Sequence, residues 1–332
     1  MSQQSLTIGD IAEAMGMSKT TVSRAISGKG RVSEETRAKV LAYIRQHNYR
    51  PNAVARGLAQ NRTYNIALVI SRKFSSFDLP FVRRSMTAVC DTAAQNDYDV
   101  LLTIADQEHP DALARLIENG KTDGVLLTSA IEDSSLTEML RARRMPFAVV
   151  GSLSDKTILQ VDNDQVSGCR ELTSLLIKLG CRRIALLGGS HRYTVNCSRL
   201  AGYEEAFRRE GLPIERSLIF MDLETLPAQL SALDQALDRR PDCLLCVDDL
   251  LSLTVLKELK KRCIRVPEDI RLASMYDCEA LEECEPGITA VQFDATTLAR
   301  TACQLLIDSI MGRPTVVLQP LGYQLVVRRS TG

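Results

Sequence analysis

The sequence lacks the patterns that mark several common enzyme classes. It has no G-x-G-x-x-G stretch, which would indicate a dinucleotide site, and no G-x-x-x-x-G-K-[ST] phosphate loop. Only three histidines are present, His47, His109 and His191, and none lies in a metal or nucleophile motif. The sequence therefore gives little support to an enzyme, although the paired acids Asp248 and Asp249 leave acid–base chemistry open.

Long apolar runs are also missing. No stretch approaches the roughly 20 residues that a membrane-spanning helix needs, and the N-terminal M-S-Q-Q-S-L-T lacks the apolar segment of a signal peptide. The ten cysteines are scattered, and Cys243 and Cys246 form the only C-x-x-C, with no second Cys/His pair at zinc spacing. We therefore expect a cytoplasmic protein without a membrane segment, metal or cofactor, in which Cys243 and Cys246 are reduced and buried.

The chain as a whole has no net charge, but its two parts carry opposite net charges. There are 41 Lys/Arg and 41 Asp/Glu residues. Residues 1–62 hold ten Lys/Arg and four Asp/Glu, a net charge of +6, which leaves −6 on the remainder. A basic head on an acidic body is the electrostatic pattern of a phosphate-binding module, although many small helical domains are also basic.

The stretch 7–28, T-I-G-D-I-A-E-A-M-G-M-S-K-T-T-V-S-R-A-I-S-G, predicts two short helices around a tight turn. The first helix has one apolar face, made by Ile8, Ile11, Ala12 and Met15. Gly16 can then end this helix in the left-handed conformation. The turn leads to Ser18, which is a good cap for the next helix.

The second helix is expected to have a covered face and a polar face. Val22, Ala25 and Ile26 should face the first helix, whereas Thr20 and Arg24, four residues apart, share the opposite face. A helix pair of this kind suits the major groove of DNA. On its own the pattern also fits a helical hairpin whose polar face is only solvated.

A third helix and a short connector follow. The third helix, expected over 32–49 with Ser33 as its cap, carries an apolar stripe of Val40, Leu41 and Ile44. Its continuation is prevented by Pro51. The next residues, 52–58, predict a helix too short to be stable alone in water, which suggests a hinge that folds on DNA. An ordinary linker would have the same composition.

Together these motifs resemble the lactose repressor/galactose repressor (LacI/GalR) family of transcription regulators. The headpiece pattern T-x-x-D-I-A-x-x-x-G-x-S-x-x-T-V-S-R is followed by V-S-x-x-T-R and N-Y-x-P-N-x-x-A-R-x-L, and the set is highly specific. Weaker family patterns continue through the rest of the chain: V-D-N-D at 161–164, R-R-I-A-L-L-G-G at 182–189, R-L-A-G-Y at 199–203, P-E-D-I at 267–270 and I-T-A-V-Q-F-D at 288–294.

The resemblance implies a set of DNA contacts by position. Lys19, Thr20 and Arg24 match the family's major-groove readers. The residues that match phosphate-contacting, positioning or further DNA contacts are Thr7, Ser18, Thr21, Ser23, Arg31 and Tyr49. In the hinge, the set includes Asn52 as the helix cap, and Ala55 and Leu58 as minor-groove residues. The family's leucine wedges between central base pairs, which is a known way to kink DNA.

Beyond Thr63 the sequence alternates apolar runs with helical stretches. Strands are expected at 66–70, 99–104, 124–128, 147–151, 184–188, 218–221, 243–247 and 272–275. Helices are expected, among others, at 81–95, 111–119, 165–179, 200–210 and 250–261. Short continuous apolar runs are typical of strands buried on both faces of a parallel sheet. We therefore expect doubly wound parallel sheets, and the length favours two lobes over one.

The resemblance then supplies the fold: an N-terminal all-α helix-turn-helix headpiece plus an α/β two-lobed, periplasmic-binding-protein-like body. The headpiece is expected at 1–50 and the hinge helix and linker at 51–62. Lobe one is expected at 63–161 with 291–318, and lobe two at 162–290 with 319–332. Ligands of such sheets bind near the carboxyl ends of the strands, here in the cleft between the lobes.

The resemblance also implies effector-binding residues. In the family an arginine, a strand-end Asn or Asp, and an aspartate of a G-[YF]-D-[DN] motif commonly hold ligand hydroxyls. Arg199 and Asp248 match the first two, but Tyr276 stands in place of the third. A frequent lobe-one aspartate is replaced by Gly151. Two carboxylates are thus missing, which predicts an effector other than a simple neutral hexose: a phosphorylated or acidic sugar, a nucleoside-like compound or a larger glycoside.

Two loop features could also meet a ligand. Phe74 and Phe77 follow the first expected strand and would either stack on a sugar ring or anchor their loop. L-L-G-G-S at 186–190 would either cradle an anion or form an ordinary turn at a strand end.

We accordingly expect a ligand-responsive, sequence-specific regulator of transcription. It would repress carbohydrate-related genes as a homodimer on a pseudo-palindromic double-stranded DNA operator, because two-fold protein symmetry matches two half-sites. An effector in the cleft would change the relation of the lobes and so of the hinges. Two other classes stay open: a sugar- or nucleoside-processing α/β enzyme with an accessory DNA-binding head, and an architectural DNA-binding protein.

Overall fold

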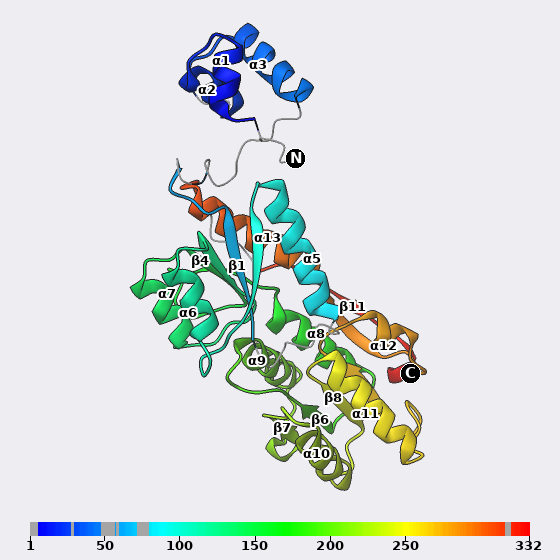
Figure 1. The fold of residues 1–332 in the computed structure, drawn as a ribbon. Helices are drawn as coiled ribbons and strands as arrows, with labels where there is room; N and C mark the ends of the chain where they lie inside the picture. The colour runs from blue at the N-terminus through cyan, green and yellow to red at the C-terminus, as the bar shows by residue number, and fades with distance from the viewer. Residues whose placement is uncertain (1–5, 28–29, 48–56, 58–59, 72–79, 316–319) are drawn as a thin grey trace. The chain divides into compact units, whose positions relative to one another are not determined.

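Two compact units make up the chain (Figure 1), Met1–Thr63 and Tyr64–Gly332. The computed structural model describes residues 6–27, 30–47, 57, 60–71, 80–315 and 320–332. Each unit has buried clusters of its own, so each can be understood by itself.

The first unit contains three helices, α1 (Ile8–Ala14), α2 (Lys19–Ser27) and α3 (Glu34–Gln46). Its core consists of five buried side chains, Ile11, Ala12, Val22, Ala25 and Val40. The prediction for Leu41 is wrong, because 37% of this residue is exposed. Tyr43 and Ile44, three and four residues after Val40, pack against the core instead, since they lie on the same face of α3.

The first sheet of the second unit is parallel throughout, in the order β2-β1-β3-β4-β5. Its strands are β1 (Asn65–Ile70), β2 (Asp99–Ile104), β3 (Gly124–Leu127), β4 (Phe147–Val150) and β5 (Leu159–Val161). The core on one face is shared with α5 (Pro80–Gln95) and α13 (Ala295–Ile310), and that on the other with α6 (Asp111–Glu118) and α7 (Ser135–Ala142). The sheet is thus doubly wound, as predicted.

The second sheet has the order β11-β10-β9-β8-β6-β7, and only the pair β10–β11 is antiparallel. Its strands are β6 (Ile184–Leu187), β7 (Ile219–Phe220), β8 (Cys243–Cys246), β9 (Arg271–Ser274), β10 (Thr289–Phe293) and β11 (Tyr323–Val326). Its helices are α8 (Gln165–Lys178), α9 (Thr194–Arg209), α10 (Leu226–Asp238), α11 (Asp249–Lys261) and α12 (Glu279–Glu283).

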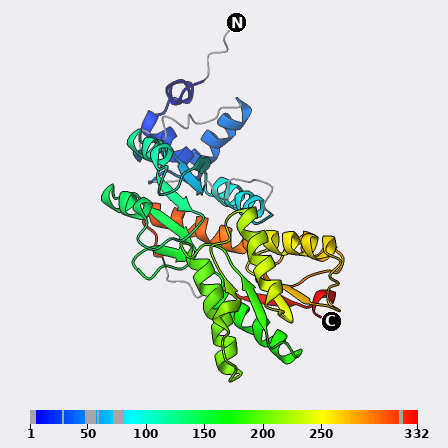
Figure 2. The same ribbon diagram turned by 90° about the horizontal axis from the view of Figure 1, so that it is seen from below.

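The lobe boundary near residue 291 differs from the expected one. Val291 pairs with Leu325 and Phe293 with Tyr323, so residues 291–293 belong to the second sheet and not to lobe one. After its passage through lobe two, the chain returns to lobe one at α13. This helix lies beside α5 on the first sheet, as Figures 1 and 2 show. Strands β5, β10 and β11 were not among the expected strands, because each is short and is interrupted by a glutamine.

Three chain crossings join the two lobes, and two of them run side by side. The Leu321 N–H donates to the Asp162 carbonyl at 2.8 Å, and the Asp164 N–H donates to the Leu321 carbonyl at 2.8 Å. The third crossing passes from β10 to α13. None of the helices in the described ranges is long and apolar enough to span a membrane.

Candidate functional site

Local capping positions the polar helix of the first unit. Thr7 and Asp10 form a capping box at α1: the Asp10 N–H donates to Thr7 Oγ1, and the Thr7 N–H donates to Asp10 Oδ2 at 2.7 Å. At α2 the Thr21 N–H donates to Ser18 Oγ at 3.0 Å. Gly16 has φ of +62° between the two helices, which agrees with the left-handed turn expected there.

The two faces of α2 are divided as the sequence predicts. Val22 and Ala25 are buried against α1 and α3. The exposed side chains are Lys19, Thr20, Ser23 and Arg24, with Thr21 half-buried and Arg31 exposed just beyond the helix. The structure therefore places the described candidates on or next to α2, except Thr7, which caps α1.

Two glycines lie against the cationic side chains of this face, Lys19 and Arg24. These glycines were not identified from the sequence. A Cβ at Gly9 would come 3.2 Å from Lys19 Cε, and a Cβ at Gly30 would come 3.1 Å from Arg24 Cδ. A larger residue at either place would have to move the cationic side chain. Tyr49, Asn52, Ala55 and Leu58 lie outside the described residues.

In the second unit, Arg199 is the centre of a buried polar cluster. Its Nε donates to Gln165 Oε1 at 3.0 Å, its Nη1 donates to the Val247 carbonyl at 2.7 Å, and its guanidinium lies 5.7 Å from the centre of the Tyr276 ring. Only 7% of Arg199 is exposed. Both of these acceptors are neutral, so they hold the guanidinium in place without neutralising its charge.

Two carboxyl groups complete the Arg199 cluster. Burial raises the pKa of Asp162, while hydrogen bonds from Ser152 and the charge of Arg199 act in the opposite direction. Burial likewise raises the pKa of Asp248, and the Leu251 N–H that it caps opposes the shift. Asp248 is thus both the N-cap of α11 and a neighbour of Arg199.

Tyr276 joins the cluster to an aromatic group that spans the lobes. Its ring stacks on Phe293 at 6.3 Å and meets the edge of Phe81, on lobe-one helix α5, at 6.0 Å. Burial raises the pKa of the Tyr276 hydroxyl. The aromatic candidates Phe74 and Phe77 lie outside the described residues, so the described aromatic contact from lobe one is made by Phe81.

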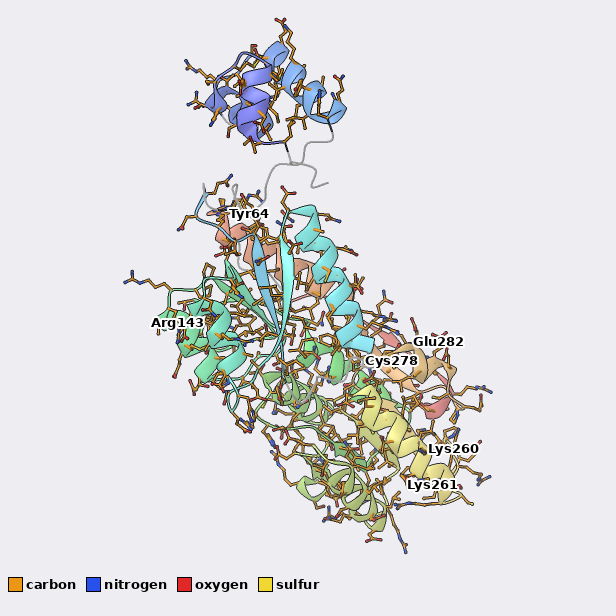
Figure 3. All side chains as sticks on the ribbon, viewed as in Figure 1. Tyr64, Arg143, Lys260, Lys261, Cys278 and Glu282 are labelled. Atoms are coloured by element: carbon orange, nitrogen blue, oxygen red, sulfur yellow. The ribbon has the colours of Figure 1, made fainter. Side chains whose placement is uncertain are left out.

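Direct contacts between the lobes surround this cluster. Ser71 Oγ and Tyr193 Oη are 3.3 Å apart, and the Thr194 N–H donates to the Ala130 carbonyl at 3.1 Å. Two ion pairs also cross: Arg192–Glu108 at 3.2 Å and Arg84–Glu279 at 2.6 Å. The second pair lies at α12, whose position beside one end of α5 is marked by Cys278 and Glu282 in Figure 3.

Gly151 explains one departure from the family pattern. It has φ of +113°, and a Cβ there would lie 2.7 Å from Ala130 Cβ. Ala130 in turn accepts the lobe-crossing hydrogen bond from Thr194. An aspartate at position 151 would therefore clash at a place where the lobes approach each other closely.

A groove with both polar and apolar lining, here called the junction groove, lies where the lobes meet and has a volume of about 580 Å³. Lobe one contributes Gln107, Ser152 and Ser154, and lobe two contributes Thr194, Cys197 and Ser198. The groove adjoins the Arg199 cluster, because Ser152 bonds Asp162 and Ser198 precedes Arg199. No motif in the sequence indicated it, since its residues come from loops and from the first turns of α9, which lie far apart in the chain.

Each of the two units matches a known protein family. The description "Bacterial regulatory proteins, lacI family" matches residues 7–52, and "Periplasmic binding protein-like domain" matches residues 173–331. The HTH-type transcriptional regulator CelR of Thermobifida fusca is 31% identical over 333 residues, which cover 98% of each chain. The chain belongs to the LacI family of bacterial transcriptional regulators.

Solved structures place this LacI-family regulator among two-lobed relatives. A transcriptional regulator CelR–cellobiose complex has a TM-score of 0.75 and 30% identity, and covers 98% of this chain and 99% of that one. A lac repressor dimer bound to operator and the anti-inducer ONPF has a TM-score of 0.79, 24% identity and 99% coverage of both chains, and supports the fold.

Proposed function

We propose that this LacI-family chain is a ligand-responsive repressor of carbohydrate-related genes that binds a pseudo-palindromic operator as a homodimer in the cytoplasm. The observation that carries the proposal is α2, whose apolar face is covered while Lys19, Thr20 and Arg24 are exposed together on the other. A helix of this kind can enter the major groove and present its side chains to base edges.

The DNA contacts divide by role. Lys19, Thr20 and Arg24 would read bases, because they project from the exposed face of α2. The residues proposed to contact phosphates or position the headpiece are Thr7, Ser18, Thr21, Ser23, Arg31 and Tyr49. The hinge residues Asn52, Ala55 and Leu58 are proposed for the minor groove. Phosphate contacts fix register and base contacts carry specificity.

The effector is proposed to bind between the lobes without being turned over. Support comes from the Arg199 cluster with Asp248 and Tyr276, which lies at the carboxyl ends of β8 and β9. A relative of 30% identity is described as a cellobiose complex, which favours a sugar. The two acceptors that Arg199 bonds are neutral and leave its charge in place, so a phosphorylated or acidic sugar stays among the proposed ligands.

Selection from a random duplex pool tests the DNA half of the proposal. The full chain should enrich a sequence with two inverted half-sites, and the protein–DNA complex should contain two chains. Enrichment of a single asymmetric site, or none, would contradict the homodimer. Adding sugars to the bound complex then tests the effector half, with the sugar recovered unchanged at the end.

A further inference from the structure

Two thiols of lobe two meet at the amino end of the second sheet, which is the end opposite the Arg199 cluster. Cys243 is the first residue of β8, and Cys181 lies in the short connection between α8 and β6. The thiols share a hydrogen bond that Cys243 donates to Cys181 Sγ. Both cysteines are fully buried and neither forms a disulfide. The pair has no part in the proposed DNA or effector contacts.

A cation lies beside this pair. Arg271 begins β9 and is the register partner of Cys243 on β8. Its Nη1 donates to Cys181 Sγ at 3.7 Å, and its Nε donates to the Thr331 carbonyl at 2.9 Å. The hydrogen bond from Cys243 and the charge of Arg271 lower the pKa of Cys181, whereas burial and the Asp242 carboxylate oppose that shift. Cys181 is therefore the more nucleophilic thiol of the two.

The backbone around the pair holds one sulfur firmly and leaves the other room to adjust. Cys243 lies on a strand that is paired on both sides, with β6 and with β9. Cys181 lies outside any helix or strand, and its N–H donates to the Leu176 carbonyl at 3.1 Å. Cys246, three residues further along β8, points to the opposite face of the sheet because side chains alternate along a strand. Cys243 is thus the partner on β8 that Cys181 can reach.

We propose that Cys181 and Cys243 form a peroxide-sensitive dithiol that closes reversibly to a disulfide inside lobe two. In the first step the Cys181 thiolate attacks one oxygen of hydrogen peroxide. An S–O bond forms, the O–O bond breaks, and the departing hydroxide takes a proton from solvent to become water. In the second step the Cys243 sulfur attacks the sulfenic sulfur of Cys181. The S–S bond forms, the S–O bond breaks, and the departing hydroxide leaves as water with the Cys243 proton.

The electrons balance, because the two thiols lose the two electrons that hydrogen peroxide gains. A small oxidant is needed, since both thiols are buried beneath the half-buried Arg271. Hydrogen peroxide is hardly larger than water and meets this requirement. The bridge would join the end of α8 to the start of β8 and would close the segment 181–243, which contains α9 with Arg199.

Peptide mapping of the full-length protein tests the site. Reduced protein would be treated with hydrogen peroxide, the peroxide removed with catalase, and the chain then unfolded, alkylated and digested without reductant. A peptide that links Cys181 to Cys243 should be the main disulfide, and dithiothreitol should restore both thiols. If peroxide oxidises the exposed Cys90, Cys197 and Cys263 while Cys181 and Cys243 stay open to alkylation, the proposal is overturned.

Cysteine variants test the pairing. Cys181→Ala should leave Cys243 reduced under the conditions that link the two residues in the parent. Cys246→Ala is the matched control, because Cys246 is also buried on β8, and it should form the bridge at the parent rate. A Cys243 that forms a disulfide with another cysteine in the Cys181→Ala protein would overturn the assigned pair.

Arg271 variants keep both thiols and test the cation. Arg271→Gln should slow bridge formation by about 3- to 10-fold near pH 7 and move the midpoint of the pH–rate profile upward, because the thiolate of Cys181 loses its neighbouring charge. Arg271→Lys keeps that charge and should restore most of the rate. Arg262→Gln, which removes an arginine that pairs with Asp234, is the control and should leave the profile unchanged. An unmoved midpoint in Arg271→Gln would overturn the role of the guanidinium.

Discussion

At the scale of single residues, the exposed face of α2 depends on two glycines as well as on its cationic side chains. Gly30 has φ of +87° and lies against the Arg24 side chain, while Gly9 lies against Lys19. Both cations thus extend over glycines, where no Cβ limits their approach. The direction of these two side chains is therefore set by neighbours on other parts of the headpiece.

Arg24→Ala should weaken operator binding by about 1–3 kcal/mol and change binding to random DNA little, because a guanidinium can pair with a guanine edge. Arg45→Ala, an exposed arginine in the last turn of α3, is the matched control and should not change the preference for operator. Fluorescence anisotropy on both DNAs measures the difference. Equal losses on operator and random DNA for Arg24→Ala would make it a phosphate contact.

Arg199→Ala should lower the unfolding free energy by about 1–3 kcal/mol, because the buried acceptors Gln165 Oε1 and Val247 O lose their donor. It should also abolish the ligand response while the headpiece still binds operator. Urea unfolding measures the first effect, and operator release by a sugar to which the parent protein responds measures the second. A full ligand response in a stable variant would remove Arg199 from the effector site.

Asp248 should make stability depend on pH. Burial raises its folded-state pKa, so the stabilising contribution of the protonated form is complete below the unfolded pKa and is lost as the pH rises through the folded pKa. Asp248→Asn removes this titration and keeps a good N-cap for α11. The stability of the variant relative to the parent should therefore increase between about pH 4 and pH 7.

Urea unfolding of both proteins at the two pH values measures that change. Asp234→Asn, at an exposed position on α10, is the control and should not gain stability with pH. A relative stability of Asp248→Asn that decreases with pH would show that the charged form of Asp248 is the favoured one in the folded protein.

At the scale of elements, the crossing of α8 and α9 positions the effector cluster. Gly202 on α9 faces α8 so closely that a Cβ would lie 2.5 Å from the Val166 carbonyl oxygen. Gln165 begins α8 and Arg199 lies one turn before Gly202, so the close approach places the two side chains within hydrogen-bond distance. The expected helix 200–210 began too late, and α9 in fact starts at Thr194.

Gly202→Ala should therefore destabilise the second unit by about 1–3 kcal/mol, because the helices must move apart. It should also weaken the ligand response, since the Arg199–Gln165 bond depends on the same crossing. Ala201→Ser, on the exposed side of α9, is the control and should stay within about 0.5 kcal/mol of the parent. Thermal unfolding provides the comparison; an unchanged Gly202→Ala protein would contradict the tight crossing.

At the scale of the whole molecule, positive and negative net charge lie in different units of the chain. The basic residues of 1–62 belong to the unit that carries the exposed face of α2, and the acidic excess belongs to the two-lobed unit. Net attraction to phosphate is therefore expected from the headpiece rather than from the two-lobed unit. Aromatic, hydrogen-bonded and ionic contacts join the lobes, so a ligand between them acts on many contacts together.

If a dimer neutralises about eight phosphates, log K for the operator should fall with log salt at a slope of about −7, because bound counterions are released. Titrations between about 50 and 200 mM salt measure the slope. The isolated second unit, residues 64–332, should show no comparable binding if it folds alone, which circular dichroism would establish first. Affinity independent of salt would contradict docking of the basic headpiece in the groove.

Local patterns determined much of this protein. The caps at Ser18 and Ser33, the turn at Gly16 and the eight apolar runs depend on residues within one turn or one strand, so the sequence alone predicted the headpiece, the doubly wound sheets and the family. Periodicity placed Thr20 and Arg24 on the exposed face of the second helix, and the family resemblance added Lys19 to them.

The tertiary structure alone decided what surrounds the effector residues. The sequence could not show that Arg199 is bonded to Gln165 and Val247, that Tyr276 meets Phe81, or that Gly151 faces Ala130. These contacts join residues far apart in the chain, and they depend on helix crossings, on strand register and on the angle between the lobes. Periodicity within one element carries no information about such distances, so the partners of a buried charge were settled only when the sheets and helices packed together.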